Sequence, residues 1–472
     1  MPDKRRRRRR RSPSRALVGL VLTVVTVTVI GSMWGQSILT GLGVLSNGGS
    51  PTIPASLYSP TPASQGPGGH GVVGRATPAP QAAEPDPAAV TRAMAAVGRP
   101  PGKLGGIVVD VDSGTTMWSS GPQTLLMPAS NLKVLTGVGL LAATDAGTRY
   151  RTRVVQDGPG KLVLVGGGDP YLLSEPSKEH PTFASTRVLA RRSAAALKKA
   201  GTTTVTLGYD ASLFTGPAWN PHWPASYADQ VTPISALWVD EGLPAGQTVR
   251  SKQPAAQAAQ VFATQLKAAG ITVTGKPTAV KADADATPVA AVDSASVEDL
   301  LTEALLHSDN STTEVLSRQM ALASGQPASF EGAVTALTSH LRALGIWQDG
   351  AVVQDGSGLS RGNRVSAAML ARAWRAVDRT PRLEPMSHAV PVSGVSGSLS
   401  HRFDAQGTAV GRGVVHAKTG TLTGVASLSG WVRTADGRIL AEAFILNDAA
   451  DVWAARIWLD KASSALASCG CR

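Results

Sequence analysis

Hydrophobic and polar positions divide the chain into three stretches. The first is an apolar run at residues 16–34, built almost entirely of Val, Leu, Thr, Ala, Gly and Ile. Residues 37–86 follow with no periodic apolar face and many Pro, Gly, Ser and Ala residues, which is typical of a linker. From residue 88 onward, helix and strand periodicities alternate up to the C-terminus, which predicts a folded body.

The folded body is expected to belong to the α+β class. Helical patterns occur at residues 88–97, 130–143, 186–199, 255–268, 297–307, 329–344 and 452–466. Strand patterns occur at residues 105–111, 115–119, 151–155, 162–165, 203–207, 271–273, 414–418, 425–432 and 439–446. The first two strands and the next two are each joined by a short turn, and the last three predict an antiparallel arrangement. Helices and antiparallel strands in quantity indicate α+β.

The apolar run predicts a membrane segment. About 20 apolar residues in a helix suffice to cross the hydrocarbon core of a bilayer. Residues 1–15 are strongly basic, so the positive-inside rule places this tail in the cytoplasm and the folded body outside. No Ala-x-Ala pattern follows the run, which favours an uncleaved anchor at residues 16–36 over a signal sequence. We therefore expect a single-pass protein of the cell membrane with an extracytoplasmic body, or a secreted protein if the segment is cleaved.

Net charge and cysteine content exclude several classes of protein. The formal net charge is +12, but nine basic residues and one acidic residue place +8 of it on residues 1–15. The remainder is nearly neutral, so we expect no nucleic-acid partner. The two cysteines, Cys469 and Cys471, lie in the last four residues, and the eight histidines have no paired spacing suited to a metal. We expect no metal and no cofactor.

Ser130 and Lys133 are three positions apart at the start of the helix expected at residues 130–143. Residues at this spacing lie on one face of a helix, about one turn apart. A lysine kept neutral by burial or by a neighbouring cation can take the proton of such a serine and make it a nucleophile. Taken alone, however, the pair favours an N-cap serine beside an exposed lysine.

Two further motifs follow in the chain. Ser308-Asp309-Asn310 comes directly after the helix expected at residues 297–307, and Lys418-Thr419-Gly420 lies in a strand-like segment. Taken singly, the first fits a polar loop and the second fits an edge strand with a solvated lysine. Together, in the order Ser-x-x-Lys, Ser-Asp-Asn and Lys-Thr-Gly, the three motifs form the signature of penicillin-recognising serine acyltransferases.

Additional segments extend the similarity to one family. They are Gly166-Gly167-Gly168-Asp169-Pro170, Ile234-Ser235-Ala236-Leu237, Asp355-Gly356-Ser357-Gly358-Leu359-Ser360, the run from Pro391 to Leu399, and Lys418-Thr419-Gly420-Thr421-Leu422. Over about residues 88–465 the chain resembles the class C low-molecular-mass penicillin-binding proteins, the D-alanyl-D-alanine carboxypeptidase/endopeptidase family. The resemblance implies a penicillin-binding/serine β-lactamase-like catalytic domain, in which an antiparallel sheet lies between helical clusters.

The family also inserts one or more domains between its first two motifs. Here 178 residues separate Ser130 from Ser308, which leaves room for one inserted domain. We expect the catalytic domain to comprise residues 87–151 and 296–472, and the inserted domain residues 152–295. The nested third domain of some family members is expected to be missing or reduced.

The resemblance implies a role for each motif residue. Ser130 would attack the penultimate D-alanine of a peptidoglycan stem peptide to form an acyl-enzyme, and β-lactam antibiotics would inhibit by acylating it. Lys133 would be the base, kept neutral by Lys418 and by partial burial, and Ser308 would pass a proton to the leaving amine. Substrate binding would involve Asn310, Lys418, Thr419 and Gly420, and the backbone N–H groups of Ser130 and Thr421 would form the oxyanion hole.

Two alternatives from other classes share these motifs. A serine β-lactamase differs in how fast the acyl-enzyme is hydrolysed, but the Glu-x-x-Leu-Asn loop of class A enzymes does not occur between Asn310 and Lys418. A catalytically inert cell-wall-binding module would not need intact motifs, and all three are intact. Penicillin turnover tests the first alternative, and D-alanine release tests the second.

Overall fold

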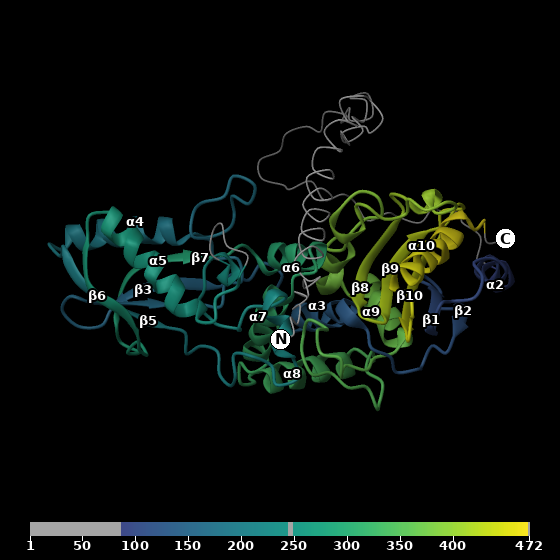
Figure 1. The fold of residues 1–472 in the computed structure, drawn as a ribbon, viewed down its shortest axis with the longest axis horizontal. Coiled ribbons are helices and arrows are strands. Elements are labelled where there is room, and N and C mark those ends of the chain that lie inside the picture. The colour runs from purple at the N-terminus through teal and green to yellow at the C-terminus, as the bar shows by residue number, and fades with distance from the viewer. Residues whose placement is uncertain (1–85, 244–248, 471–472) are drawn as a thin grey trace, which may run out of the picture. The chain divides into compact units, whose positions relative to one another are not determined.

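The computed structural model describes residues 86–243 and 249–470. The predicted basic tail, the predicted anchor and all but the last residue of the predicted linker lie outside these ranges. Within them, no helix is long and apolar enough to cross a membrane. Two five-stranded sheets organise this part of the chain (Figure 1).

The first sheet is antiparallel throughout and has the strand order β2-β1-β10-β9-β8. Its strands are β1 (Lys103–Asp110), β2 (Thr116–Ser120), β8 (Val415–Leu422), β9 (Val425–Arg433) and β10 (Ile439–Asn447). The predicted β1–β2 hairpin and the predicted antiparallel arrangement of the last three strands are therefore confirmed. β8 lies at one edge of the sheet and carries the Lys-Thr-Gly motif.

Helices cover both faces of the first sheet, because successive side chains of a strand point to opposite faces. In β10, Ala441, Ala443 and Ile445 pack in a core with α3 (Leu132–Ala143) and α9 (Ala367–Arg379). Leu440 and its neighbours on the other face, Phe444 and Leu446, pack with α2 (Pro87–Ala96) and α10 (Val452–Ser468). This arrangement confirms the predicted α+β class and the sheet between helical clusters.

The second sheet is mixed, with the strand order β6-β5-β4-β3-β7. Its strands are β3 (Arg151–Gln156), β4 (Lys161–Val165), β5 (Thr204–Asp210), β6 (Thr272–Ala279) and β7 (Thr287–Asp293). The β3–β4 hairpin is antiparallel as predicted, whereas β4 and β5, and β5 and β6, are parallel. α4 (Thr186–Lys199) and α5 (Pro254–Ala268) make the two crossovers that parallel pairing requires, and apolar side chains of both helices pack on the sheet.

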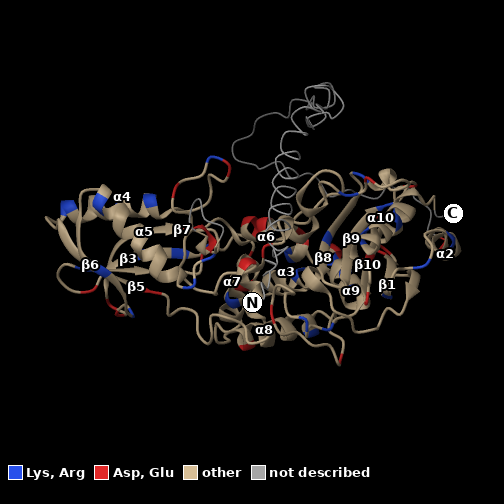
Figure 2. Ribbon diagram, in the orientation of Figure 1, with Lys and Arg blue, Asp and Glu red and all other residues tan. Residues whose placement is uncertain are grey.

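The second sheet and its helices carry more basic than acidic residues. Four basic residues of α4 are exposed: Arg191, Arg192, Lys198 and Lys199. Figure 2 marks basic positions in blue along the ribbon of this helix. The two lysines belong to the last turn, where cations interact favourably with the helix dipole. The helix dipole therefore explains why Lys198 and Lys199 lie at this end of α4.

A long connection after β5 packs on two helices that contact α3. Residues 212–242 contribute Trp223, Val231 and Trp238 to an apolar cluster with Val315 of α7 (Asn310–Ala323) and Phe330 of α8 (Phe330–Ala343). The buried Arg318 guanidinium of α7 donates to the backbone carbonyl groups of Thr215 and Pro217, both at 2.8 Å. This connection therefore borders the start of α7, where the Ser-Asp-Asn motif lies.

Candidate active site

Ser130 and Lys133 lie together at the start of α3. The chain enters this helix through a 3₁₀ turn, Ala129–Asn131, in which Ala129 has a φ of 48°. One turn further on, the Nζ atom of Lys133 lies 3.1 Å from the Oγ atom of Ser130 and can donate a hydrogen bond to it. Lys133 is fully buried, whereas Ser130 is partly accessible. A reagent can thus reach the hydroxyl while its lysine partner stays shielded from water.

Burial lowers the pKa of Lys133 from 10.5 to about 8. The carboxyl groups of Asp309, Asp355 and Glu314 act in the opposite direction. The sequence analysis expected Lys418 and partial burial to keep Lys133 neutral, whereas the burial is complete and is itself the cause of the lowered pKa. An amine of this pKa is neutral often enough near pH 7 to 8 to act as a general base.

Lys133 is fixed by two acceptors besides Ser130. Its Nζ atom donates to the Oδ1 atom of Asn310 at 2.8 Å and to the backbone carbonyl oxygen of Ser357 at 2.7 Å. The backbone N–H of Ser357 in turn donates to the buried carboxyl group of Glu314 at 2.7 Å. Glu314 therefore holds the loop that orients Lys133.

Ser308 and Asn310 lie at the junction of α6 (Val297–Leu306) and α7. Ser308 has a φ of 58°, an uncommon backbone conformation for a residue other than glycine. Asp309 caps α7 by accepting from the backbone N–H of Thr312 at 2.5 Å. The Nδ2 atom of Asn310 donates to the backbone carbonyl of Gln230 at 3.1 Å, which leaves its Oδ1 atom facing Lys133.

β8 supplies a second serine–lysine pair. The Nζ atom of Lys418 donates to the Oγ atom of Ser308 at 2.8 Å and to the backbone carbonyl of Thr419 at 2.9 Å. Lys418 is fully buried, and burial together with the nearby Lys133 lowers its pKa well below the ordinary value. The partly accessible Thr419 hydroxyl lies 2.7 Å from the hydroxyl of Ser398.

Gly420 lets β8 pass close to the turn that carries Ser130. A Cβ atom at this position would lie 2.7 Å from the carbonyl oxygen of Pro128 and 3.0 Å from the backbone nitrogen of Ser130, so a larger residue would force the two segments apart. The same turn is tied to β9, because the Ser427 hydroxyl donates to Pro128 at 2.6 Å and accepts from Asn131 at 2.8 Å. These contacts bring the Ser130 N–H close to the β8 backbone.

The structure brings the predicted residues together where α3, the α6–α7 junction and β8 meet. They are Ser130, Lys133, Ser308, Asn310, Lys418, Thr419 and Gly420, and Thr421 follows as an exposed residue of β8. Both lysines are buried, while the three hydroxyl groups and the Asn310 amide remain partly accessible. The set can therefore pair a nucleophilic hydroxyl with a proton acceptor and bind a carboxylate beside it.

Sequence reasoning missed four residues that shape this site. Asn131 lies inside the Ser-x-x-Lys motif and Ser398 lies inside one of the segments that carried the resemblance, so a signal for them existed. Glu314 and Gln230 have no local signal, because their contacts with the site depend on segments far apart in the chain.

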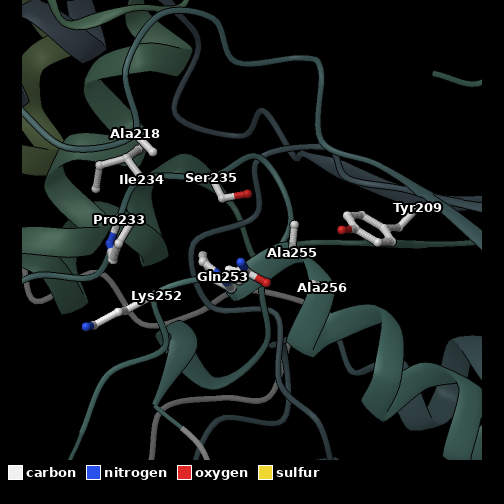
Figure 3. Close-up of a pocket in the computed structure, with 10 residues that line it drawn as sticks. Tyr209, Ala218, Pro233, Ile234, Ser235, Lys252, Gln253, Ala255 and Ala256 are labelled. Carbon is white, nitrogen blue, oxygen red and sulfur yellow. The ribbon is translucent and has the colours of Figure 1, made fainter. Parts of the chain in front are cut away.

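No three metal-ligating side chains gather within residues 86–243 and 249–470. A cavity of about 280 Å³ in this part of the chain contains none of the predicted site residues (Figure 3). Tyr209 of β5, Ser235 and the start of α5 line it, together with Lys252 and Gln253. Ala218 and Ile234 of the connection also line it, so the cavity lies between the connection, β5 and the start of α5.

Solved structures share this fold. Penicillin-binding protein 4 (DacB) of Haemophilus influenzae aligns with a TM-score of 0.65 and 23% identity, over 79% of this chain and 97% of that chain. The same protein in complex with a β-lactam aligns with a TM-score of 0.63 and 21% identity, over the same shares of both chains. The chain therefore has the fold of these penicillin-binding proteins, with two serine–lysine pairs at one edge of the antiparallel sheet.

Sequence comparison places the chain within that class. The model of the D-Ala-D-Ala carboxypeptidase 3 (S13) family matches residues 88–245 and 241–466. A carboxypeptidase of Mycobacterium tuberculosis is 35% identical over 405 residues, which cover 83% of this chain and 86% of the relative. Carboxypeptidase DacB of Mycolicibacterium smegmatis is 34% identical over 380 residues, which cover 78% and 81%. The chain belongs to the D-Ala-D-Ala carboxypeptidase 3 (S13) family, which confirms the resemblance found in the sequence.

Proposed function

We propose that this protein is a serine-type D-Ala-D-Ala carboxypeptidase or endopeptidase that cleaves peptidoglycan stem peptides through an acyl-enzyme on Ser130. The observation that carries the proposal is the 3.1 Å contact between the buried Lys133 amine and the Ser130 hydroxyl. Family membership supports the substrate class, since the family is defined by a D-Ala-D-Ala carboxypeptidase. Acylation by β-lactams, which resemble the scissile peptide, is expected at the same serine.

Acylation begins as the Oγ atom of Ser130 bonds to the carbonyl carbon of the penultimate D-alanine and Lys133 takes the hydroxyl proton. Negative charge develops on the carbonyl oxygen, where the backbone N–H groups of Ser130 and Thr421 would stabilise it. The intermediate then breaks its bond to the leaving amine. Ser308 would pass a proton to that amine and regain the proton that Lys133 took from Ser130. Lys418, hydrogen-bonded to Ser308 at 2.8 Å, supports that transfer. An ester on Ser130 and a free amine result.

Substrate binding favours the reactive form of the base. The hydroxyl of Thr419 and the amine of Lys418 would bind the terminal carboxylate, Asn310 would bind the substrate amide, and Gly420 leaves room beside the nucleophile. A bound carboxylate stabilises the cationic form of Lys418. The positive charges of the two buried lysines repel each other. A proton on Lys418 therefore makes a proton on Lys133 less favourable. The bound substrate therefore promotes the neutral Lys133 that acylation needs.

Water then hydrolyses the ester and releases the shortened stem peptide. When the leaving amine is free D-alanine, the reaction is that of a carboxypeptidase. When the amine belongs to a second stem peptide, the same chemistry cuts a cross-link. The complete set of site residues and the family assignment favour this peptidase over the serine β-lactamase and the inert wall-binding module.

The full-length chain, purified in detergent, is expected to release D-alanine from a diacetyl-lysyl-D-alanyl-D-alanine peptide and to be labelled covalently by a fluorescent penicillin. Mass spectrometry of the products from defined cross-linked fragments would separate carboxypeptidase from endopeptidase activity. Rapid penicillin hydrolysis without D-alanine release would support the β-lactamase instead. A chain that shows neither labelling nor release would support the inert module.

We also infer that the enzyme is held at the outer surface of the cell membrane. The basic residues 1–15, the apolar residues 16–36 and the linker at residues 37–86 support a single-pass anchor with the catalytic body in the cell envelope. The catalytic domain would comprise residues 87–151 and 296–472, with one inserted domain at residues 152–295. The second sheet supports that insertion, since all its strands lie between Arg151 and Asp293.

The anchor predicts how the chain fractionates. In bacterial cells that produce the full-length protein, the chain is expected to stay in the membrane pellet after an alkaline carbonate wash. Protease added outside the cell membrane of spheroplasts should digest the body and leave a short protected N-terminal fragment. Recovery of a shortened chain in the medium would show cleavage of the segment and contradict the anchor.

A further inference from the structure

Residues 230–242 contact three consecutive residues, Asp309, Asn310 and Ser311, of which the first two belong to the Ser-Asp-Asn motif. The carbonyl oxygen of Gln230 accepts from the Asn310 side chain at 3.1 Å. The backbone N–H of Thr232 donates to the hydroxyl of Ser311 at 3.1 Å. The side chain of Glu241 is hydrogen-bonded to that of Asp309. The motif is thus held from outside its own helix, by the connection that follows the second sheet's β5.

A hydrogen bond between two carboxyl groups needs a proton on one of them, because two carboxylates side by side repel each other. Asp309 is the better anion of the two, since it caps α7 and accepts from the backbone N–H of Thr312 at the positive end of the helix dipole. Burial, and next the Asp309 charge, raise the pKa of Glu241 well above its ordinary value. Glu241 is therefore the donor of the pair and Asp309 the acceptor.

Other charged and titratable groups surround the pair. Arg250 opposes the raised pKa of Glu241, whereas Asp240 adds to it. The buried Tyr171 lies close enough to interact with both carboxyl groups, and with Glu303 of α6. Lys133 is the cation of α3 that interacts with Asp309. Asp309 directly precedes Asn310, whose side chain accepts a hydrogen bond from Lys133.

The backbone at Glu241 is held in an uncommon conformation. Asp240 and Glu241 have φ values of 50° and 53°, in the left-handed region that residues other than glycine rarely adopt. Three contacts maintain it. The Thr232 hydroxyl donates to the carbonyl of Glu241 at 2.6 Å, Arg250 donates to the Thr232 hydroxyl at 3.1 Å, and Asp240 accepts from the backbone N–H of Ser174 at 2.8 Å. Backbone of this kind costs energy and persists only where the surrounding contacts hold it.

We propose that Glu241 is a positioning residue for the active site, whose protonated carboxyl group donates to Asp309 and so fixes Ser308 and Asn310 relative to Lys133. This inference rests on the proposed function. It assigns to the connection after β5 a part in catalysis, although none of its side chains needs to touch the substrate. When Glu241 loses its proton at high pH, it can no longer donate to Asp309, and the two carboxylates repel each other. Ser308 and Asn310 are then held less firmly relative to Lys133.

Two variants of the full-length chain test whether Glu241 acts as a hydrogen-bond donor or only fills space. Glu241→Gln keeps a donor that cannot be titrated, whereas Glu241→Ala removes it. The exposed Glu179→Gln, also within residues 151–293, is the matched control. For each chain, the rate of acylation by fluorescent penicillin and the kcat and KM of D-alanine release are measured from pH 6 to 10, together with the unfolding temperature.

At pH 7, Glu241→Ala is expected to lose about tenfold in acylation rate and in kcat, the cost of a small misplacement of catalytic groups. Glu241→Gln should stay close to the wild type. Above the pKa of Glu241 the wild type should lose activity, and Glu241→Gln should lose less. The Gln variant alone decides the question if the Ala variant does not fold.

Identical alkaline profiles of the wild type and Glu241→Gln would overturn the inference. So would a folded Glu241→Ala variant with wild-type rates at every pH. A wild-type chain that neither binds penicillin covalently nor releases D-alanine would instead overturn the proposed function, so the two failures are distinct.

Discussion

Replacing Ser130 by alanine is expected to abolish covalent labelling by fluorescent penicillin and to lower D-alanine release by more than about a thousandfold. The Oγ atom of Ser130 would form the acyl bond. Among the residues that the structure describes, no other hydroxyl is hydrogen-bonded to Lys133, and Ser308 is hydrogen-bonded to Lys418 instead. Labelling is read on a gel, and D-alanine release is read by mass spectrometry.

The unfolding temperature of Ser130→Ala should change little, because this partly accessible hydroxyl provides only one of the three acceptors of Lys133. Ser468→Ala, at the exposed end of α10, is the matched control and should label normally. Persistent labelling of Ser130→Ala at the wild-type rate would exclude Ser130 as the nucleophile.

Lys133→Met is expected to lower the acylation rate by about 10² to 10⁴-fold, the usual contribution of a general base. Methionine fills similar space in the buried site but cannot accept a proton. The measurement is the second-order rate constant of penicillin acylation. Lys461→Met, on the exposed side of α10, controls for the loss of a lysine and should react like the wild type.

The same variant tests the pKa of the base. Only neutral Lys133 can take a proton, so wild-type acylation should rise about tenfold per pH unit below the pKa and level off above it. With a pKa of about 8 this rise falls between pH 6 and 8. The residual rate of Lys133→Met should lack that rise. A wild-type rate that is constant from pH 6 to 9 would contradict a lysine base of this pKa.

Much of the fold was predictable, because most elements have an exposed side and a buried side. The hairpins and the C-terminal strands follow from alternating apolar residues and turn sequences, and the structure confirms them. α9 was missed although Met369, Leu370, Ala373, Trp374 and Val377 recur at helical spacing and are buried. That helix could have been predicted.

α7 and β7 could not be predicted in the same way. Eleven of the fourteen residues of α7 are buried, yet most of the helix is polar: Ser311, Thr312, Thr313, Glu314, Ser317, Arg318 and Gln319. Ser311, Glu314, Arg318 and Gln319 have hydrogen-bond partners in segments remote in sequence, so no amphipathic pattern marks the helix. β7 is largely exposed, has a proline as its second residue and lies at the edge of its sheet, so it becomes a strand only by pairing with β3.

The residues of the candidate site were predictable from the motifs, but their burial and hydrogen bonds were not. The order of the three motifs identifies the residues that the structure brings together. The complete burial of both lysines, and the support of Lys133 by Glu314 through Ser357, depend on long-range packing. No sequence spacing identifies a charged side chain such as Glu314, which contacts the site only by holding a loop.

The packing of residues 212–242 limits how this enzyme could be shortened. A minimal enzyme cut at the predicted boundaries, residues 152–295, would lose the Trp223 indole that donates to Asp355 at 2.8 Å, and would expose Val315 and Phe330 to water. A design that keeps residues 212–242 and removes only the strands and helices of the second sheet would keep the wall of the site. Residues 152–295 thus contain two parts with different contacts: a sheet with its own helices, and a connection that packs on α7 and α8.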